Sequence, residues 1–121
     1  MTHDDAGQLV AIAKHIQDLD ELIAQLLKGL PRVKPWHRQI ARHLADVDRQ
    51  LQVLRMTVSM EKQGAEILQA AQELASACRL SAVALMGTRA DATTRAAVNL
   101  VADLAERIRR AIAEMEGQGR C

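Results

Sequence analysis

The chain has 121 residues, about half of them apolar, and a formal net charge of +1. This length suits one domain with one core, and the near-neutral charge argues against a whole-molecule field that attracts nucleic acid or an anionic membrane. Helix-forming residues dominate, Pro occurs twice, and Trp36 stands alone among Phe, Tyr and Trp. This composition predicts an all-α protein.

Cysteine usage and the N-terminus favour a cytoplasmic protein. Cys78 and Cys121 are too few for a disulfide framework and form no C-x-x-C motif. The first residues, MTHDDAGQ, lack a signal-peptide layout, and the longest uncharged run, Leu80–Thr88, is too short to span a bilayer. Twelve Arg against four Lys, with abundant Ala, favour a GC-rich bacterial source.

The first predicted helix covers about residues 5–28. Asp4 or Asp5 can cap its start. Gly29 can adopt the left-handed conformation and Pro31 prevents continuation, so the helix stops there. Its apolar residues recur at alternating steps of three and four, which forms a heptad seam. The seam residues are Leu9, Ile12, Ile16, Leu19, Ile23 and Leu26.

Two further seams predict helices at about 35–62 and 65–86, the first opening with Pro35 at its first position. The seams are out of phase by one residue, roughly 100° around a helix. The polar stretch 61–66, which contains Gly64, lies at this discontinuity. Two interpretations follow: a turn near Gly64, or one fused helix of about 50 residues whose bundle is completed by dimerisation.

A fourth helix is predicted at about 91–116, with Asp91 as its cap and a frayed tail at 117–121. Four segments of similar length with short connections favour an antiparallel up-and-down four-helix bundle. The fold class is therefore all-α, with residues 1–121 forming a single helical-bundle domain.

No pattern of catalytic, cofactor-binding or metal-ligating residues is recognisable. His15, His37 and His43 lack a Glu three positions earlier, as di-iron bundles require. The serines lack a nucleophile-elbow motif, and the glycines form no phosphate loop. Cys78 lies on an apolar stripe, which predicts a core position. We therefore predict no enzymatic activity, no cofactor and no metal.

The charge is distributed unevenly along the first two helices. Residues 1–21 hold five acids and one base, whereas residues 22–45 hold five bases and no acid. A basic turn beside a Trp can bind an acidic partner or phosphates. The candidate partner-binding residues, which we call the basic turn, are Lys28, Arg32, Lys34, Trp36, His37, Arg38 and Arg42.

The alternative interpretation of the basic turn is structural. A hairpin centred near residue 32 places Asp18, Asp20 and Glu21 within reach of Arg42 and Arg49, which would neutralise the segregated charges. Trp36 opens the second seam, so it is also expected to cover the end of the core.

Three functions are compatible with these features. The first is a non-enzymatic interaction protein (an adaptor, a chaperone-like protein, or a regulatory or assembly subunit) that binds a protein partner or a second copy. Met56, Met60, Met86 and Met115 would suit an adaptable binding face, or else fill core gaps. The second is a nucleic-acid-associated regulator using residues 28–42. The third is a ligand- or metal-binding bundle with a polar pocket near His15 or His43. No membrane contact is expected.

Overall fold

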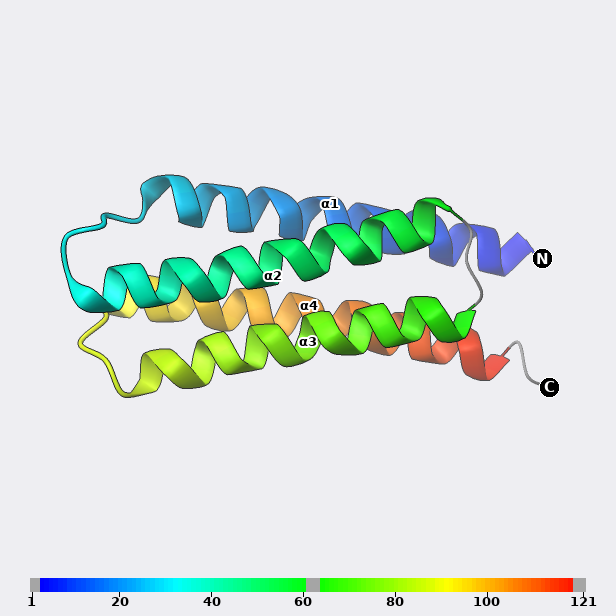
Figure 1. Cartoon of the computed structure of the whole chain (residues 1–121). Helices are drawn as coiled ribbons and strands as arrows, with labels where there is room; N and C mark the ends of the chain where they lie inside the picture. The colour runs from blue at the N-terminus through cyan, green and yellow to red at the C-terminus, as the bar shows by residue number, and fades with distance from the viewer. Residues whose placement is uncertain (1–2, 61–63, 119–121) are drawn as a thin grey trace.

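The computed structural model describes residues 3–60 and 64–118. They form four antiparallel helices, α1 (His3–Gly29), α2 (Pro35–Ser59), α3 (Gly64–Met86) and α4 (Ala92–Gln118) (Figure 1). Helices α1 and α3 each pack against α2 and α4, while the diagonal pairs make no close approach among these residues. The predicted up-and-down four-helix bundle is confirmed.

Helices α2 and α3 are separate, so the alternative of one long fused helix is wrong. Helix α2 ends at Ser59, and α3 begins at Gly64. Because the two seams differ in phase, a straight helix would have turned one of them away from the core. The last residues of the predicted second helix, 61 and 62, lie outside the described residues, as do residues 119–121 of the predicted tail.

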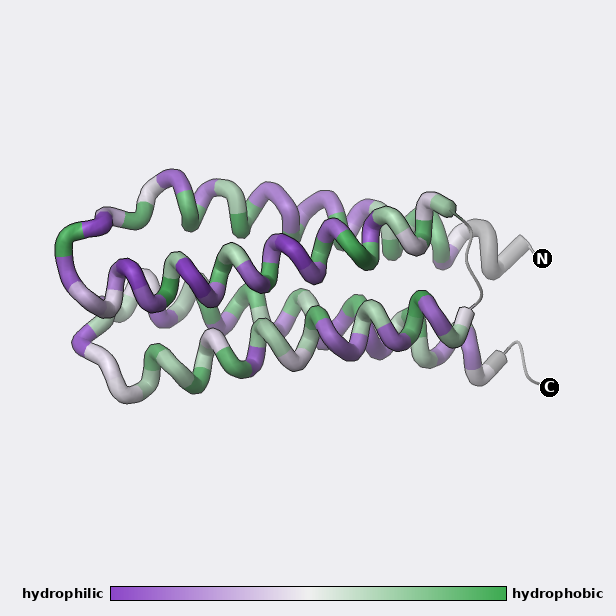
Figure 2. The backbone as a smooth tube through the Cα atoms, in the orientation of Figure 1, coloured by the Kyte–Doolittle hydropathy of each residue, from purple (hydrophilic) through white to green (hydrophobic). Residues whose placement is uncertain are grey.

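The predicted seams supply the core. Leu19, Ile23, Leu51, Leu54 and Leu74 are among the fully buried side chains of the larger apolar cluster. Cys78 is buried there too, as expected. Apolar residues alternate with hydrophilic ones along each helix, as an amphipathic bundle requires (Figure 2). A smaller cluster closes one end of the bundle and consists of Ile40, Leu44, Leu85, Ala90 and Val98.

Small residues explain why α3 packs more extensively than α1. Ala70, Ala71 and Ala75 of α3 and Ala105 of α4 are buried. A methyl side chain lets two helix backbones approach closely. These four alanines therefore take part in helix packing inside the bundle.

The pairing of α1 with α2 differs from the expected register. Asp20 accepts hydrogen bonds from Arg55 (3.2 Å) and Gln52 (3.1 Å), and Arg49 pairs with Asp46 of its own helix (3.0 Å). The predicted approach of Asp20 to Arg42 and Arg49 is therefore wrong. Residues 30–34 do not fold back in a tight turn, and α1 stops short of the end that α2 reaches (Figure 1). This setback moves each α1 residue along the axis relative to α2.

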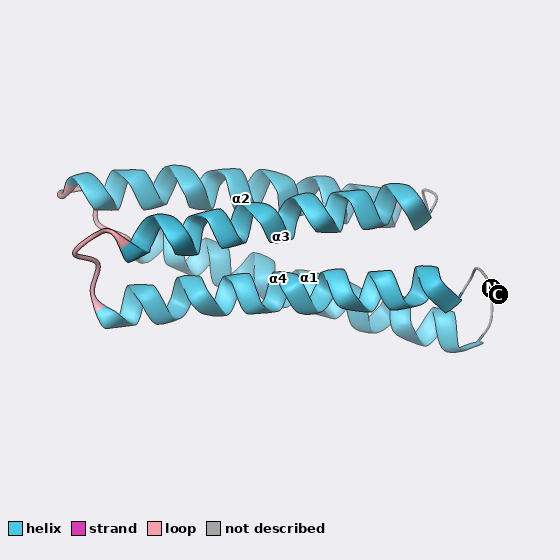
Figure 3. Cartoon of the chain, turned by 90° about the horizontal axis from the view of Figure 1, so that it is seen from below, coloured by secondary structure: helices cyan, strands magenta, loops and turns pink. Residues whose placement is uncertain are grey.

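Both described interhelical connections, 30–34 and 87–91, lie at one end of the bundle, which we call the loop end (Figure 3). The start of α1 and the end of α4 lie at the opposite end (Figure 3). Among the described helices, none combines the length and hydropathy needed to cross a bilayer.

Candidate binding site at the loop end

The loop end concentrates positive charge. Because the helices run up and down, the connection between α3 and α4 lies at the same end as the basic turn and adds Arg89, and the start of α4 adds Arg95. Asp91 is the one acid in residues 28–42 and 87–95. The five bases of the basic turn are exposed, and none forms an ion pair with an acid of the described residues. The predicted neutralisation of Arg42 and Arg49 by acids of α1 is therefore absent from the described residues, and Asp20 pairs across the hairpin with Arg55 instead.

The aromatic part of the basic turn packs into the end of the bundle. Trp36 is half-buried against the smaller apolar cluster, so it covers the end of the core as predicted. The His37 ring lies 4.1 Å from the Trp36 ring, measured between centroids, and the His37 residue is only 7% exposed. Trp36 and His37 therefore belong to the framework that holds the bases around them.

His37 secures the first turn of α2. Its Nδ1 accepts a hydrogen bond from the backbone N–H of Lys34 (2.9 Å), which satisfies a donor that a helix start leaves free. An accepting Nδ1 carries no proton, so the hydrogen of the neutral ring lies on Nε2. Pro35 needs no acceptor at the first helical position. The sequence alone identified Pro35 but not this use of His37.

A cleft of about 290 Å³ opens beside these two rings. It lies between the end of α1, the connection that follows it, and the starts of α2 and α4. The cleft exists because α1 stops short and leaves the space between α2 and α4 uncovered. Its walls are mostly apolar and comprise Gln25, Leu26, Gly29, Leu30, Pro31, Trp36, His37, Leu44, Asp91, Thr93, Thr94 and Val98.

The α4 side of the cleft is held by local hydrogen bonds. Asp91 caps the helix as predicted, since its Oδ1 accepts from the backbone N–H of Thr94 (2.7 Å). This bond is the main cause of a pKa of Asp91 below its ordinary value, and the positive charge of the nearby Lys34 adds a smaller effect in the same direction. Arg95 donates to the carbonyl oxygens at positions 88 (2.6 Å) and 90 (3.0 Å) and so ties the connection to α4.

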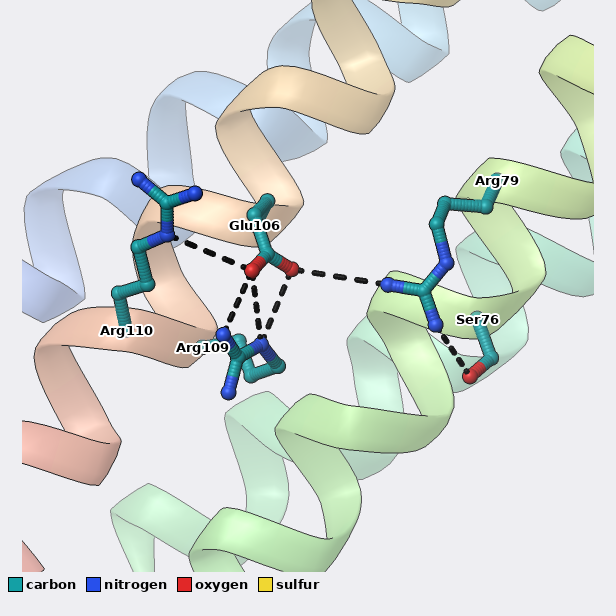
Figure 4. Close-up of polar contacts among 5 residues, drawn as sticks. All are labelled: Ser76, Arg79, Glu106, Arg109 and Arg110. Carbon is teal, nitrogen blue, oxygen red and sulfur yellow. Dashed lines mark hydrogen bonds and ion pairs between the residues drawn. The ribbon is translucent and has the colours of Figure 1, made fainter.

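A second polar cluster lies away from the loop end. Glu106 of α4 accepts from Arg109 (2.6 to 3.0 Å) and lies near Arg110 (3.4 Å) and, across the helix interface, Arg79 (3.6 Å) (Figure 4). The hydrogen bonds from Arg109 are the main cause of the lowered pKa of Glu106. One carboxylate serving three bases is a satisfied structural arrangement and offers no open site.

The other candidates of the sequence do not assemble. His15 is exposed on α1, and His43 is half-buried on α2. Among the described residues, no three His, Cys, Asp or Glu side chains gather as metal ligands would. The loop end is therefore the best-developed candidate site.

Comparison of the chain with protein-family models, with curated proteins and with solved structures gives no match. Function has to be inferred from the geometry and chemistry of the loop end.

Proposed function

We propose that this protein is a non-enzymatic interaction module of the cytoplasm, which binds a protein partner through the loop end. The observation that carries the proposal is the set of five exposed bases of the basic turn, none of them in an ion pair with an acid of the described residues, at the same end of the bundle as an apolar cleft. In a monomer, such bases are usually balanced across the surface by acids. Here they remain available to an acidic surface on another protein.

The residue types support recognition of a protein. Three of the five bases are arginines (Arg32, Arg38 and Arg42), whose planar guanidinium groups bind carboxylates with two parallel hydrogen bonds. Arg and Trp are also enriched among the residues that contribute most to protein interfaces. An apolar centre with a charged rim is the usual layout of such an interface.

A second copy of the chain is the alternative partner, and exposed apolar residues favour it. Leu80, Val83 and Met86 follow one another on the outer side of α3 and are 64%, 63% and 74% exposed. Met56 on α2 and Met60, directly after its end, are also exposed. Met115 of the predicted methionine face instead packs against the core. Self-association would cover the face on α3 and leave the loop end free.

Nucleic acid is the less favoured ligand. Nucleic-acid binding depends mainly on basic residues that contact phosphates. The loop end has the five bases of the basic turn, Arg89 and Arg95, but Arg95 is bonded to backbone carbonyls and the whole chain has a net charge of only +1. The apolar cleft has no use in a purely phosphate-binding surface.

The test compares two double variants with equal changes in charge. In one, Arg38→Glu and Arg42→Glu reverse two bases of the loop end. In the control, Arg49→Glu and Arg107→Glu reverse two exposed bases elsewhere. Crosslinking in the cell that naturally makes the protein identifies partners. Calorimetry with each purified partner then measures its affinity for both double variants. We expect the loop-end variant to weaken binding at least tenfold and the control to change it less than twofold.

Two results would contradict this proposal. One is equal binding of a purified partner by both double variants when circular dichroism shows both to be folded. The other is a protein that sediments as a monomer and crosslinks to no protein in the cell.

A further inference from the structure

One ring that lines the cleft at the loop end, that of His37, has a donor without an acceptor among the described residues. Among the described residues, the side chain of His37 makes one hydrogen bond, in which its Nδ1 accepts from the backbone N–H of Lys34. The remaining Nε2–H belongs to a ring that lines the cleft and is more than nine-tenths buried. Trp36 also lines the cleft, but its Nε1 is enclosed by the protein and is not open to the cleft. The unpaired Nε2–H of His37 favours an acceptor brought by a ligand.

The electrostatic surroundings specify a negatively charged acceptor. Both α2 and α4 begin at this end, and a helix start carries partial positive charge. Lys34 and Arg38 lie on the same turn as His37 and have no acidic partner in the described structure. The carboxylate of Asp91 lies at the α4 wall and is already engaged by Thr94. A ligand anion is therefore expected on the α2 side of the cleft.

The apolar walls specify the rest of the ligand. Leu26, Leu30, Leu44 and Val98 line a volume of about 290 Å³, at the lower limit of pockets that enclose a drug-sized molecule. This space suits one large aliphatic side chain better than a complete cofactor. A nucleobase needs an open aromatic face for stacking, and Trp36 already packs against the core.

We propose that the cleft binds an acidic segment of a partner protein, with one aliphatic side chain inserted among the leucines and neighbouring carboxylates held by Lys34, Arg38 and the Nε2–H of His37. This inference rests on the proposed function and specifies the chemistry of the segment that is bound. The aliphatic residue supplies apolar burial, and the carboxylates supply the acceptors.

The test uses blocked synthetic peptides and the fluorescence of Trp36, which is the only Trp of the chain. The first peptide is acetyl-Glu-Glu-Leu-Glu-Glu-amide. A second replaces Leu with Ser, and a third replaces every Glu with Gln. We expect the first to shift the Trp36 emission saturably, to bind at least fivefold more tightly than the Ser peptide and at least tenfold more tightly than the Gln peptide.

Variants separate the cleft from its charged rim. Leu30→Phe fills the cleft from the connection, and Gln25→Phe fills it from an exposed position on α1, so that one variant remains if the other unfolds. Either variant is expected to bind the Leu peptide and the Ser peptide with nearly equal affinity. Lys34→Gln with Arg38→Gln should weaken binding of the Leu peptide at least fivefold, whereas Arg49→Gln with Arg107→Gln should change it less than twofold.

Other outcomes overturn the inference in distinguishable ways. Equal binding of the Leu and Ser peptides, with dependence on Lys34 and Arg38, would reject the aliphatic anchor and leave the proposed function intact. Tighter binding of a ten-nucleotide single strand, or of phosphatidylglycerol vesicles, than of the Leu peptide would reject the peptide in favour of that ligand. A Trp36 emission that no acidic peptide changes would reject the cleft as a site, while crosslinking still tests the proposed function.

Discussion

Replacing Leu74 by Ala, compared with the same replacement at Leu80, tests which side of α3 faces the core. The two residues lie on one helix six positions apart, and their exposed fractions are 0% and 64%. Helix propensity changes equally at both sites, because the substitution is the same. Any difference in stability between the variants therefore reports burial.

The expected magnitude follows from the contacts that are lost. Leu74→Ala removes three fully buried carbon groups, each worth about 0.8 kcal/mol, and leaves a cavity that adds to the loss. We expect the free energy of unfolding to fall by about 3 kcal/mol, a large part of the roughly 5–15 kcal/mol that holds a domain together. Leu80→Ala should change it by about 0.5 kcal/mol or less.

Urea denaturation followed by circular dichroism measures both effects. For a slope of about 2 kcal/mol/M, Leu74→Ala lowers the midpoint by roughly 1.5 M. A loss below about 1 kcal/mol for Leu74→Ala, or equal losses for both variants, would refute the assigned faces of α3. A Leu80→Ala loss that appears only at high protein concentration would instead show that a second copy covers this face.

Three further predictions concern single groups elsewhere. Burial raises the pKa of the Cys78 thiol to about 12, so a Cys121→Ser protein at pH 8 should react with Ellman's reagent at least 100-fold more slowly when folded than in urea; equal rates would mean that Cys78 is accessible. The pKa of Glu106 is lowered from about 4.5 in the folded state, so its stabilisation is complete above that value and disappears as the pH falls through the folded-state pKa. Glu106→Gln should therefore cost about 0.5–1 kcal/mol in urea denaturation at pH 7 and nothing at strongly acidic pH, and a constant difference would contradict this origin. A side chain at Gly64 would meet the Glu116 carboxylate. In a Glu116→Ala protein, Gly64→Ala should therefore raise the free energy of unfolding, measured by thermal denaturation, by about 0.5–1 kcal/mol, and in the protein with Glu116 it should raise it by less. Identical gains in the two proteins would show that the contact is unimportant.

The sequence alone was sufficient to predict the helices, their order and which face of each is buried. Helix formation depends on contacts three and four residues apart, so the recurring leucines and isoleucines reveal each face. Pro31 and Pro35 restrict their own backbone, and Asp91 caps α4 through a residue three positions away. The bases and Trp36 of the candidate site were also recognisable, because a segment with five bases and no acid is visible in the sequence itself.

Only the tertiary structure decided how these elements are positioned along the bundle axis. The five residues 30–34 can close a hairpin in several ways, and interhelical packing selects the one that sets α1 back. That setback pairs Asp20 with Arg55, leaves Arg38 and Arg42 without acids and opens the cleft beside His37. Periodicity gives the rotation of a helix about its own axis but not its translation along that axis, since a shift of one helix past another leaves its buried face unchanged.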